Sequence, residues 1–219
     1  LDLDTFDFSK AKITFFAAGG KISEKFVQEA SKKSMIIDNS SFFRMDPDVP
    51  LIVPQVNSED LKKIKKNIIA NPNCSTAQLV IALKPLHDLF GIKRAVISTY
   101  QSVSGGGKAQ MDELIEQTKL VLNNKKVISK NFTKQIAFNA IPHIDEFSQD
   151  GYTKEELKMV NETKKILDKK IDITSTCVRI PVLVSHAESI NIEFEKSFTL
   201  DEIKKALDNF EGCKVIDNR

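Results

Sequence analysis

The stretch IIANPNCSTAQLVIALKPL (residues 68–86) joins a short apolar segment to a longer one, and the rest of the chain is organised on either side of it. Its first part belongs to NIIAN (67–71), which is expected to form a strand. Asn-Pro-Asn then favours an extended, turn-prone approach, and a helix is expected to begin just after Asn73 or Cys74. Cys74 thus lies at a predicted helix N-terminus, where free N–H groups and the helix dipole favour a thiolate.

A cysteine at such a position has two interpretations. It is either a small apolar packing residue, which is the commoner role, or a nucleophile with a base within hydrogen-bond reach. Among the three histidines, His87 falls inside the predicted helix and His143 in a turn-like link, whereas His186 follows a predicted strand. From the residues alone, His186 is only slightly favoured as that base.

Before Cys74, short apolar segments alternate with helical ones. KITFFAA (12–18) and SMIID (34–38) are expected to be buried strands, with a helix over ISEKFVQEASKK between them. Residues 39–57 contain three prolines and are expected to form a loop around a short strand, followed by a surface helix that Ser58 caps. This alternation predicts parallel βαβ organisation up to about residue 73.

After Cys74, the predicted strands are longer. Two Thr/Glu pairs, Thr153–Glu156 and Thr199–Glu202, have the spacing of capping boxes and are expected to open helices. Long strands combined with helices predict an antiparallel-type sheet that is covered on one side. A further helix is expected to carry Met111, Leu114, Ile115 and Leu122 on one face. The expected strands are IKRAVISTYQSV (92–103), ITSTCVRIPVLV (173–184) and HAESINIEFEK (186–196).

Composition excludes several classes of protein. The 219 residues are 41% hydrophobic and 28% charged, as in an ordinary globular protein. A net charge of +2 gives no reason to expect nucleic acid or a membrane surface as partner, and no apolar run approaches the roughly 20 residues of a membrane span. No metal site and no signal peptide are expected. Cys74, Cys177 and Cys213 are widely spaced, which favours reduced thiols in the cytoplasm.

The loop QSVSGGGKAQ (101–110) resembles a phosphate-binding loop only superficially. Ser102 stands where a Walker A motif requires glycine, and Ala109 where it requires Ser or Thr after the lysine. The glycines still permit close approach of the backbone to a ligand, although a flexible strand-to-helix turn explains them equally well.

A resemblance covers nearly the whole chain. NPNCSTAQLVIALKPLHDLFGIKRAVISTYQSVSGGGKAQMDEL (71–114) is similar to the aspartate-β-semialdehyde dehydrogenase family, and SSFFRMDPDVPLIVPQVN, FNAIPHID, ETKKIL and VRIPVLVSHAESINIEFEK resemble it in the same order. The resemblance implies an α/β and α+β fold. Residues 1–73 would form the second half of a Rossmann-type NADP-binding domain. Residues 74–219 would form a catalytic and dimerisation domain like that of glyceraldehyde-3-phosphate dehydrogenase, incomplete at its C-terminus.

The family resemblance also implies an activity. It is the NADP-dependent, phosphate-requiring oxidation of L-aspartate 4-semialdehyde to L-4-aspartyl phosphate through a cysteine thioester. The reverse reaction serves the biosynthesis of lysine, diaminopimelate, threonine and methionine. A small-molecule substrate and inorganic phosphate are then the expected ligands, and the expected assembly is a homodimer or a tetramer.

The same resemblance implies the role of individual residues. Cys74 corresponds to the nucleophile and His186 to the general acid/base, while Gln101 corresponds to the residue that orients the substrate. Arg179 would hold the substrate's α-carboxylate and Glu162 its α-amino group. Arg44 and Lys165 correspond to the pair of residues that bind phosphate. Ser104 and Gly105 correspond to residues that contact the nicotinamide end of the cofactor.

Two features depart from the family. The sequence has no match to the family's G-x-x-G-x-x-G loop, nor to its final strand and helix, so the chain as given is expected to bind NADP poorly or not at all. Two alternatives stay open: an N-acetyl-glutamyl-phosphate reductase, which shares the reaction type, and a non-catalytic module that retains only the dimer-forming core.

Overall fold

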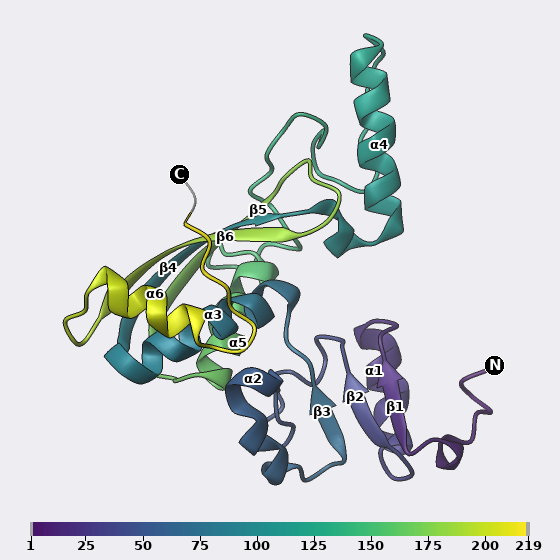
Figure 1. Ribbon diagram of the computed structural model, residues 1–219. Helices are drawn as coiled ribbons and strands as arrows, with labels where there is room; N and C mark the ends of the chain where they lie inside the picture. The colour runs from purple at the N-terminus through teal and green to yellow at the C-terminus, as the bar shows by residue number, and fades with distance from the viewer. Residues whose placement is uncertain (1, 218–219) are drawn as a thin grey trace. The chain divides into compact units, whose positions relative to one another are not determined.

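The computed structural model describes residues 2–217, and this part of the chain divides into two compact units. The first unit contains residues up to Gly91, together with Asn161–Lys170 and the chain from Lys196 onward; the second contains Ile92–Val160 and Ile171–Glu195. Helix α5 (Lys154–Ile166) begins in the second unit and ends in the first. The elements can be followed by label in Figure 1.

The first unit is built on a parallel sheet in the order β1-β2-β3. In the register of the sheet, Ile13 lies beside Met35 and Ile36 beside Ile68. Helix α1 (Gly20–Ala30) connects the first two strands, which confirms the predicted βαβ organisation. The strands are β1 (Ile13–Phe16), β2 (Met35–Asp38) and β3 (Ile68–Ala70), and a short 3-10 helix, η1 (Phe8–Lys10), precedes them.

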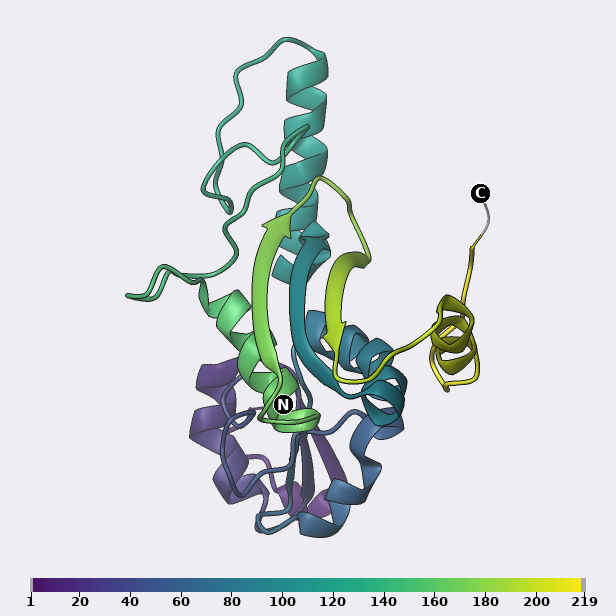
Figure 2. The same cartoon turned by 90° about the vertical axis from the view of Figure 1, so that its left-hand side faces the viewer.

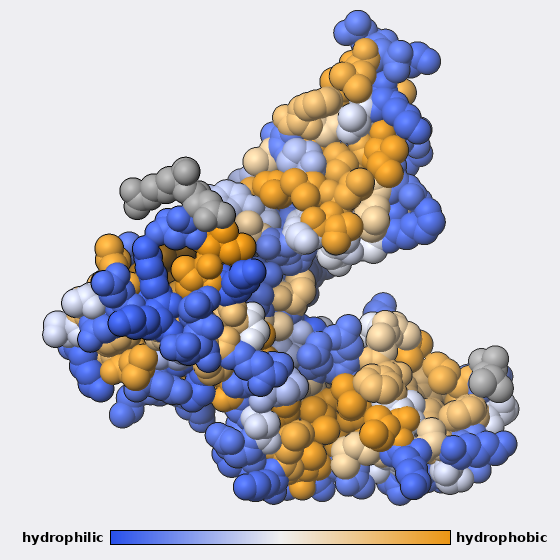
Figure 3. Space-filling model, in the orientation of Figure 1, coloured by the Kyte–Doolittle hydropathy of each residue, from blue (hydrophilic) through white to orange (hydrophobic). Residues whose placement is uncertain are grey.

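The prediction that β1 is buried is wrong. Only Phe16 is buried in this strand, whereas Phe15 is 73% exposed and Ile13 is 54% exposed. The reason is that β1 is an edge strand, and nothing among the described residues covers its outward-facing side chains. Figure 3 shows apolar surface over this part of the first unit.

The loop between β2 and β3 contains less strand and more helix than expected. Its strand pairing is a single bridge between Leu51 and Ala70. It is followed by α2 (Pro54–Asn57) and the 3-10 helix η2 (Ser58–Lys63). Asn57, and not Ser58, precedes η2, and its side chain donates to the Leu51 carbonyl over 2.9 Å.

Two further helices complete the first unit. Helix α3 (Cys74–Phe90) begins at the predicted place, and helix α6 (Leu200–Asp208) packs against it. Thr199 and Glu202 form the predicted capping box of α6. The core of the unit includes Phe16, Val27, Ile36, Ile68 and Val80.

The second unit contains a sheet in the order β5-β4-β6, whose three strands lie side by side in Figure 2. Its strands are β4 (Ile92–Gln101), β5 (Asp172–Arg179) and β6 (His186–Phe194). Because β4 pairs with β5 in parallel and with β6 antiparallel, the sheet is mixed, and the expected antiparallel type is wrong. Strand β5 also ends at Arg179, before Pro181, which has no N–H to donate to a ladder.

A 3-10 helix and a long helix follow β4 in the second unit. These are η3 (Val103–Gly106) and α4 (Lys108–Leu122). Of the predicted apolar face of α4, Leu114 is buried, whereas Ile115 is 41% exposed and Leu122 is 71% exposed. The capping box at the start of α5 is confirmed, because the Thr153 N–H donates to the Glu156 carboxylate over 2.7 Å and the Glu156 N–H donates to the Thr153 hydroxyl over 3.3 Å.

Within residues 2–217, no helix is long and apolar enough to cross a membrane. The same part of the chain holds no cluster of His, Cys, Asp and Glu side chains that could bind a metal ion. The expected domain boundary between residues 73 and 74 stays a prediction.

Candidate active site

The predicted site residues fall into two groups, one in each unit. The first unit brings together Arg44, Cys74, Glu162 and Lys165. The second unit brings together Gln101, Ser104, Gly105, Arg179 and His186.

Cys74 is the first residue of α3 and is exposed. The Asn73 side chain caps the helix by accepting a hydrogen bond from the Ser75 N–H over 2.9 Å, and the same amide oxygen lies 3.9 Å from the Cys74 Sγ. The other two cysteines are less accessible, and burial raises the pKa of the Cys177 thiol to about 12. Cys74 is therefore the cysteine best placed for chemistry, at the positive end of a helix.

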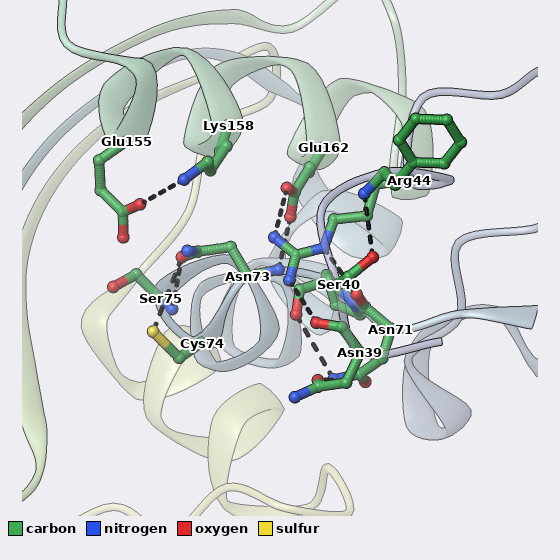
Figure 4. Close-up of polar contacts among 12 residues, drawn as sticks. Asn39, Ser40, Arg44, Asn71, Asn73, Cys74, Ser75, Glu155, Lys158 and Glu162 are labelled. Atoms are coloured by element: carbon green, nitrogen blue, oxygen red, sulfur yellow. Dashed lines mark hydrogen bonds and ion pairs between the residues drawn. The ribbon is translucent and has the colours of Figure 1, made fainter. Parts of the chain in front are cut away.

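The turn before Cys74 is held by a buried ion pair, drawn in Figure 4. Glu162 is 1% exposed, and its two carboxylate oxygens have different donors. One accepts from Arg44 Nη1 over 3.1 Å and the other from the Asn73 N–H over 2.6 Å. Arg44 also donates to the carbonyls of Asn39 and Asn71, so the guanidinium ties the ends of β2 and β3 to α5.

Burial raises the pKa of the Glu162 carboxyl. The Arg44 charge, the Asn73 N–H and hydrogen bonds from the Arg44 and Thr76 side chains act in the opposite direction and lower it. These donors favour the carboxylate form in a place where water cannot solvate it. The network thus connects the charge of Glu162 directly to the backbone beside Cys74.

Lys165 holds the loop that follows Arg44. Its Nζ donates to three carbonyls, those of Arg44, Asp46 and Val49, over 2.7, 2.8 and 2.9 Å. An ammonium group has three donors, so all of them are used within the chain. Burial lowers the pKa of Lys165. The family resemblance alone assigns Lys165 a phosphate-binding role, and in this structure its ammonium group holds residues 44–49 as a clamp.

We expect Lys165→Met to lower the free energy of unfolding by about 2 kcal/mol or more, because three carbonyls lose their donor. Chemical denaturation followed by circular dichroism measures the loss. Lys164→Met is the matched control, since it removes the same charge from the neighbouring half-buried position. Equal losses in the two variants would contradict the clamp.

In the second unit, Gln101 and Arg179 are both buried. The Gln101 side chain accepts from the Thr99 hydroxyl over 3.0 Å and donates to Glu155 over 3.1 Å. Arg179 Nη1 donates to the Ser102 carbonyl over 2.6 Å. These contacts fix the ends of the adjacent strands β4 and β5, where both side chains are placed.

His186 is half-buried at the start of β6. Its Nδ1 lies 3.1 Å from the main-chain nitrogen of Ser102 and 3.2 Å from the Ser102 hydroxyl, which in turn lies 2.9 Å from the Ser104 hydroxyl. Burial and the positive charge of Arg179 lower the pKa of His186, against the opposing effects of the Ser185 backbone and Glu155. The ring is therefore biased toward its neutral form.

We expect His186 to titrate below 6.5, the ordinary value for histidine, and the midpoint to rise in Arg179→Gln because a nearby positive charge is removed. NMR titration of the imidazole Hε1 signal, assigned with His186→Asn, measures both midpoints. A wild-type midpoint at or above 6.5 would contradict the bias toward the neutral ring.

The glycines after Ser104 permit close packing against this group. A Cβ on Gly105 would stand 3.0 Å from Arg179 Nη1 and 3.7 Å from the His186 Nε2 and Cε1 atoms. Gly107 has a φ of +81°, and nothing lies within 4 Å of its Cβ position. Gly105–Gly107 are exposed, so a flat ring such as a nicotinamide could approach their backbone closely.

Sequence reasoning missed two residues of the second group. Ser102 contacts both His186 and Arg179 through its main chain, and Glu155 accepts from Gln101. Every residue carries the same main-chain groups, so the identity of Ser102 could not indicate its contacts. Glu155 had no feature in the sequence that pointed to the site, beyond its place in the first turn of α5.

Comparison with known families gives the class of this protein. Residues 1–64 match the profile described as semialdehyde dehydrogenase, NAD binding domain, and residues 83–219 match that described as semialdehyde dehydrogenase, dimerisation domain. Together with the parallel sheet of the first unit and the mixed sheet of the second, these matches place the chain in the semialdehyde dehydrogenase class and confirm the predicted α/β and α+β fold class.

Individual relatives narrow the class. The chain is 53% identical to the aspartate-semialdehyde dehydrogenase of Aquifex aeolicus over 96% of its length and 63% of the relative's. It is 46% identical to that of Vibrio mimicus over 98% of the chain and 69% of the relative. A solved structure of aspartate semialdehyde dehydrogenase II from Vibrio cholerae, complexed with ASA, matches with a TM-score of 0.95 at 46% identity, over 97% of this chain and 64% of that one. The chain therefore belongs to the aspartate-semialdehyde dehydrogenase family, as its sequence motifs predict. It spans slightly less than two thirds of the Aquifex and Vibrio cholerae proteins.

Proposed function

We propose that the protein containing this chain catalyses the phosphorylating oxidation of L-aspartate 4-semialdehyde to L-4-aspartyl phosphate, and its reverse, through a thioester on Cys74. The observation that carries the proposal is an exposed cysteine at the capped N-terminus of α3, on a turn held by the Glu162–Arg44 pair. The names of the relatives support the choice of substrate.

The chemistry begins at Cys74. A thiolate at a helix N-terminus attacks the aldehyde carbon, which gives a thiohemiacetal on the cysteine. A nicotinamide cofactor, when bound, accepts the hydride whose loss converts the thiohemiacetal to a thioester. We propose NADP as this cofactor, with Ser104 and Gly105 at its nicotinamide end; the match to an NAD binding domain supports a nicotinamide cofactor of either kind.

The second group of residues would bind and orient the substrate. An arginine fork matches a carboxylate with two parallel hydrogen bonds, and we assign Arg179 to the substrate's α-carboxylate. Gln101 would orient the acyl group, and His186 would act on the carbonyl oxygen as the general acid/base. The buried contacts of Gln101 and Arg179 support these roles, because they fix both side chains before the substrate arrives.

Phosphate then attacks the thioester, and two cations suit a dianion. We propose Arg44 and Lys165 for this role, and Glu162 for the α-amino group of the substrate. Each of these side chains already has partners within the chain, so ligand binding would exchange at least one of those contacts.

The assembly, cellular location and pathways of the protein are proposed from its family. We propose a cytoplasmic homodimer or tetramer that serves lysine, diaminopimelate, threonine and methionine biosynthesis. The match to a dimerisation domain supports an oligomer.

The test is phosphate-dependent NADPH formation by the full-length protein, with L-aspartate 4-semialdehyde and N-acetyl-glutamate semialdehyde supplied separately. Activity on the first substrate alone is expected. Activity only on the second would overturn the substrate and the roles of Glu162 and Arg179. Silence on both would favour a non-catalytic dimerising module.

A further inference from the structure

The side-chain amide of Gln101 has a partner on each of its two polar atoms. Gln101 is the last residue of β4 and is 1% exposed. Its Oε1 accepts from the Thr99 hydroxyl over 3.0 Å, and its Nε2 donates to Glu155 Oε1 over 3.1 Å. An amide oxygen has two lone pairs and an amide nitrogen has two hydrogens. These two contacts therefore leave one acceptor site and one donor site of the amide for a ligand.

The two partners of Gln101 differ in what they fix. The Thr99 hydroxyl rotates, and it also forms a hydrogen bond with the Cys177 side chain. A hydroxyl and a thiol can each donate or accept, so neither determines which way the amide points. A carboxylate can only accept, so the amide atom that faces Glu155 has to be the nitrogen. An amide turned by 180° would place two acceptors against each other.

Lys158 supplies the counter-charge that keeps Glu155 in its carboxylate form. Its Nζ lies 3.2 Å from Glu155 Oε2, drawn in Figure 4, and 2.8 Å from the Asp145 carboxylate. Burial lowers the pKa of Lys158, but the charges of Glu155 and Asp145 raise it by more, so the ammonium stays protonated. Glu155 is itself buried, and a buried carboxylate stays ionised when a positive charge lies beside it.

We propose that Glu155 is a positioning residue for the reaction: it holds the Gln101 amide in one orientation, with the nitrogen toward α5, so that the amide presents a fixed donor and a fixed acceptor to the acyl group. A flipped amide would present a lone pair where the substrate meets an N–H, or the reverse. The inference rests on the proposed function for the role of Gln101. The hydrogen bond between the two side chains does not depend on it.

The orientation of the amide can be read by 1H–15N NMR of protein labelled with 15N-glutamine. Gln101→Leu assigns the signal, and the exposed Gln28 side chain is the reference. A hydrogen bond to a charged acceptor deshields the donated proton. We therefore expect one Hε2 proton of Gln101 to lie downfield of those of Gln28, and to move upfield in Glu155→Gln. A wild-type Gln101 signal that matches Gln28 would overturn the proposal, whether or not the variant folds.

A double-variant cycle on the full-length protein tests whether Glu155 acts through Gln101. Glu155→Gln keeps the size of the side chain, but its amide can donate as well as accept, so Gln101 is free to flip. We expect Glu155→Gln to lower kcat/KM by about tenfold and Gln101→Leu by about 10²-fold. The double variant should lose no more than Gln101→Leu alone, because nothing is left to position. A loss of about 10³-fold, the product of the two, would overturn the proposal.

The cycle also excludes an effect of Glu155 through His186. Burial lowers the pKa of His186, and the negative charge of Glu155 opposes that effect. Removing this charge would act on the histidine whether or not Gln101 is present. A loss that passes through His186 would therefore persist in the Gln101→Leu background, and the losses would multiply.

Glu156→Gln is the matched control, since Glu156 is the next residue of α5 and is also buried. Its carboxylate accepts from the main-chain N–H groups of Thr153 and Cys177 and has no contact of record with Gln101. Any loss in Glu156→Gln should multiply with that of Gln101→Leu. If it does not, the cycle reports damage to the fold, and the specific role of Glu155 is wrong. If the wild-type protein turns over neither semialdehyde, the proposed function fails, whereas the NMR result still decides whether Glu155 holds the amide.

Discussion

Cys74→Ala is expected to lower kcat for the semialdehyde by about 10⁴-fold or more, because it removes the atom that carries the acyl group. Binding of the substrate and the fold should be nearly unchanged, since the Cys74 side chain is exposed. Phosphate-dependent NADPH formation measures the loss. Near-normal unfolding and substrate affinity in the variant show that the effect is chemical.

The same residue should dominate the thiol chemistry of the protein. Cys74 is exposed at a helix N-terminus, whereas Cys177 is buried with its pKa raised to about 12 and burial also raises the pKa of Cys213. Iodoacetamide should therefore label Cys74 first, and NADPH formation should fall in step with that labelling. The matched control is Cys213→Ala, which should retain activity and the same rate of inactivation. Labelling of Cys74 that is no faster than that of Cys213 would contradict its role as a nucleophile.

Features that depend on neighbours in sequence were predictable. The helix start at Cys74 and the two capping boxes each follow from residues within a few positions of one another. Local backbone chemistry determines such features, because a cap or a turn is satisfied by groups within one helical turn.

Features that depend on distant contacts were not predictable from the residues. Arg44 and Glu162 are 118 positions apart, and only the family resemblance gave a reason to single them out. The three carbonyl partners of Lys165 and the Ser102 amide beside His186 belong to the main chain, which every residue carries, so residue type gives no signal for them. The exposure of β1 likewise depends on its position at the edge of the sheet and not on its apolar composition.

Glu162→Ala is expected to lower the free energy of unfolding by about 3–5 kcal/mol, because it leaves the buried Arg44 guanidinium without its counter-charge. The Asn73 N–H, 2.6 Å from the carboxylate in the wild-type protein, also loses its acceptor. Chemical denaturation followed by circular dichroism measures the effect. The double variant Arg44→Met/Glu162→Leu is the control. The double variant removes both charges and therefore leaves no buried charge without a partner. Its free energy of unfolding should fall less than that of the single variant.

The stability of Glu162→Ala, its KM and the alkylation rate of its Cys74 together distinguish two roles for Glu162. If the carboxylate mainly binds the α-amino group of the substrate, Glu162→Ala should raise KM while the unfolding curve and the alkylation rate of Cys74 stay the same. If it mainly holds the Asn73 backbone, stability should fall and Cys74 should become less reactive even without substrate, because the helix N-terminus beside it is no longer fixed. The 2.6 Å contact and the 1% exposure of Glu162 favour the second outcome. A rise in KM with unchanged stability would show that the buried pair is dispensable to the fold and reserved for the substrate.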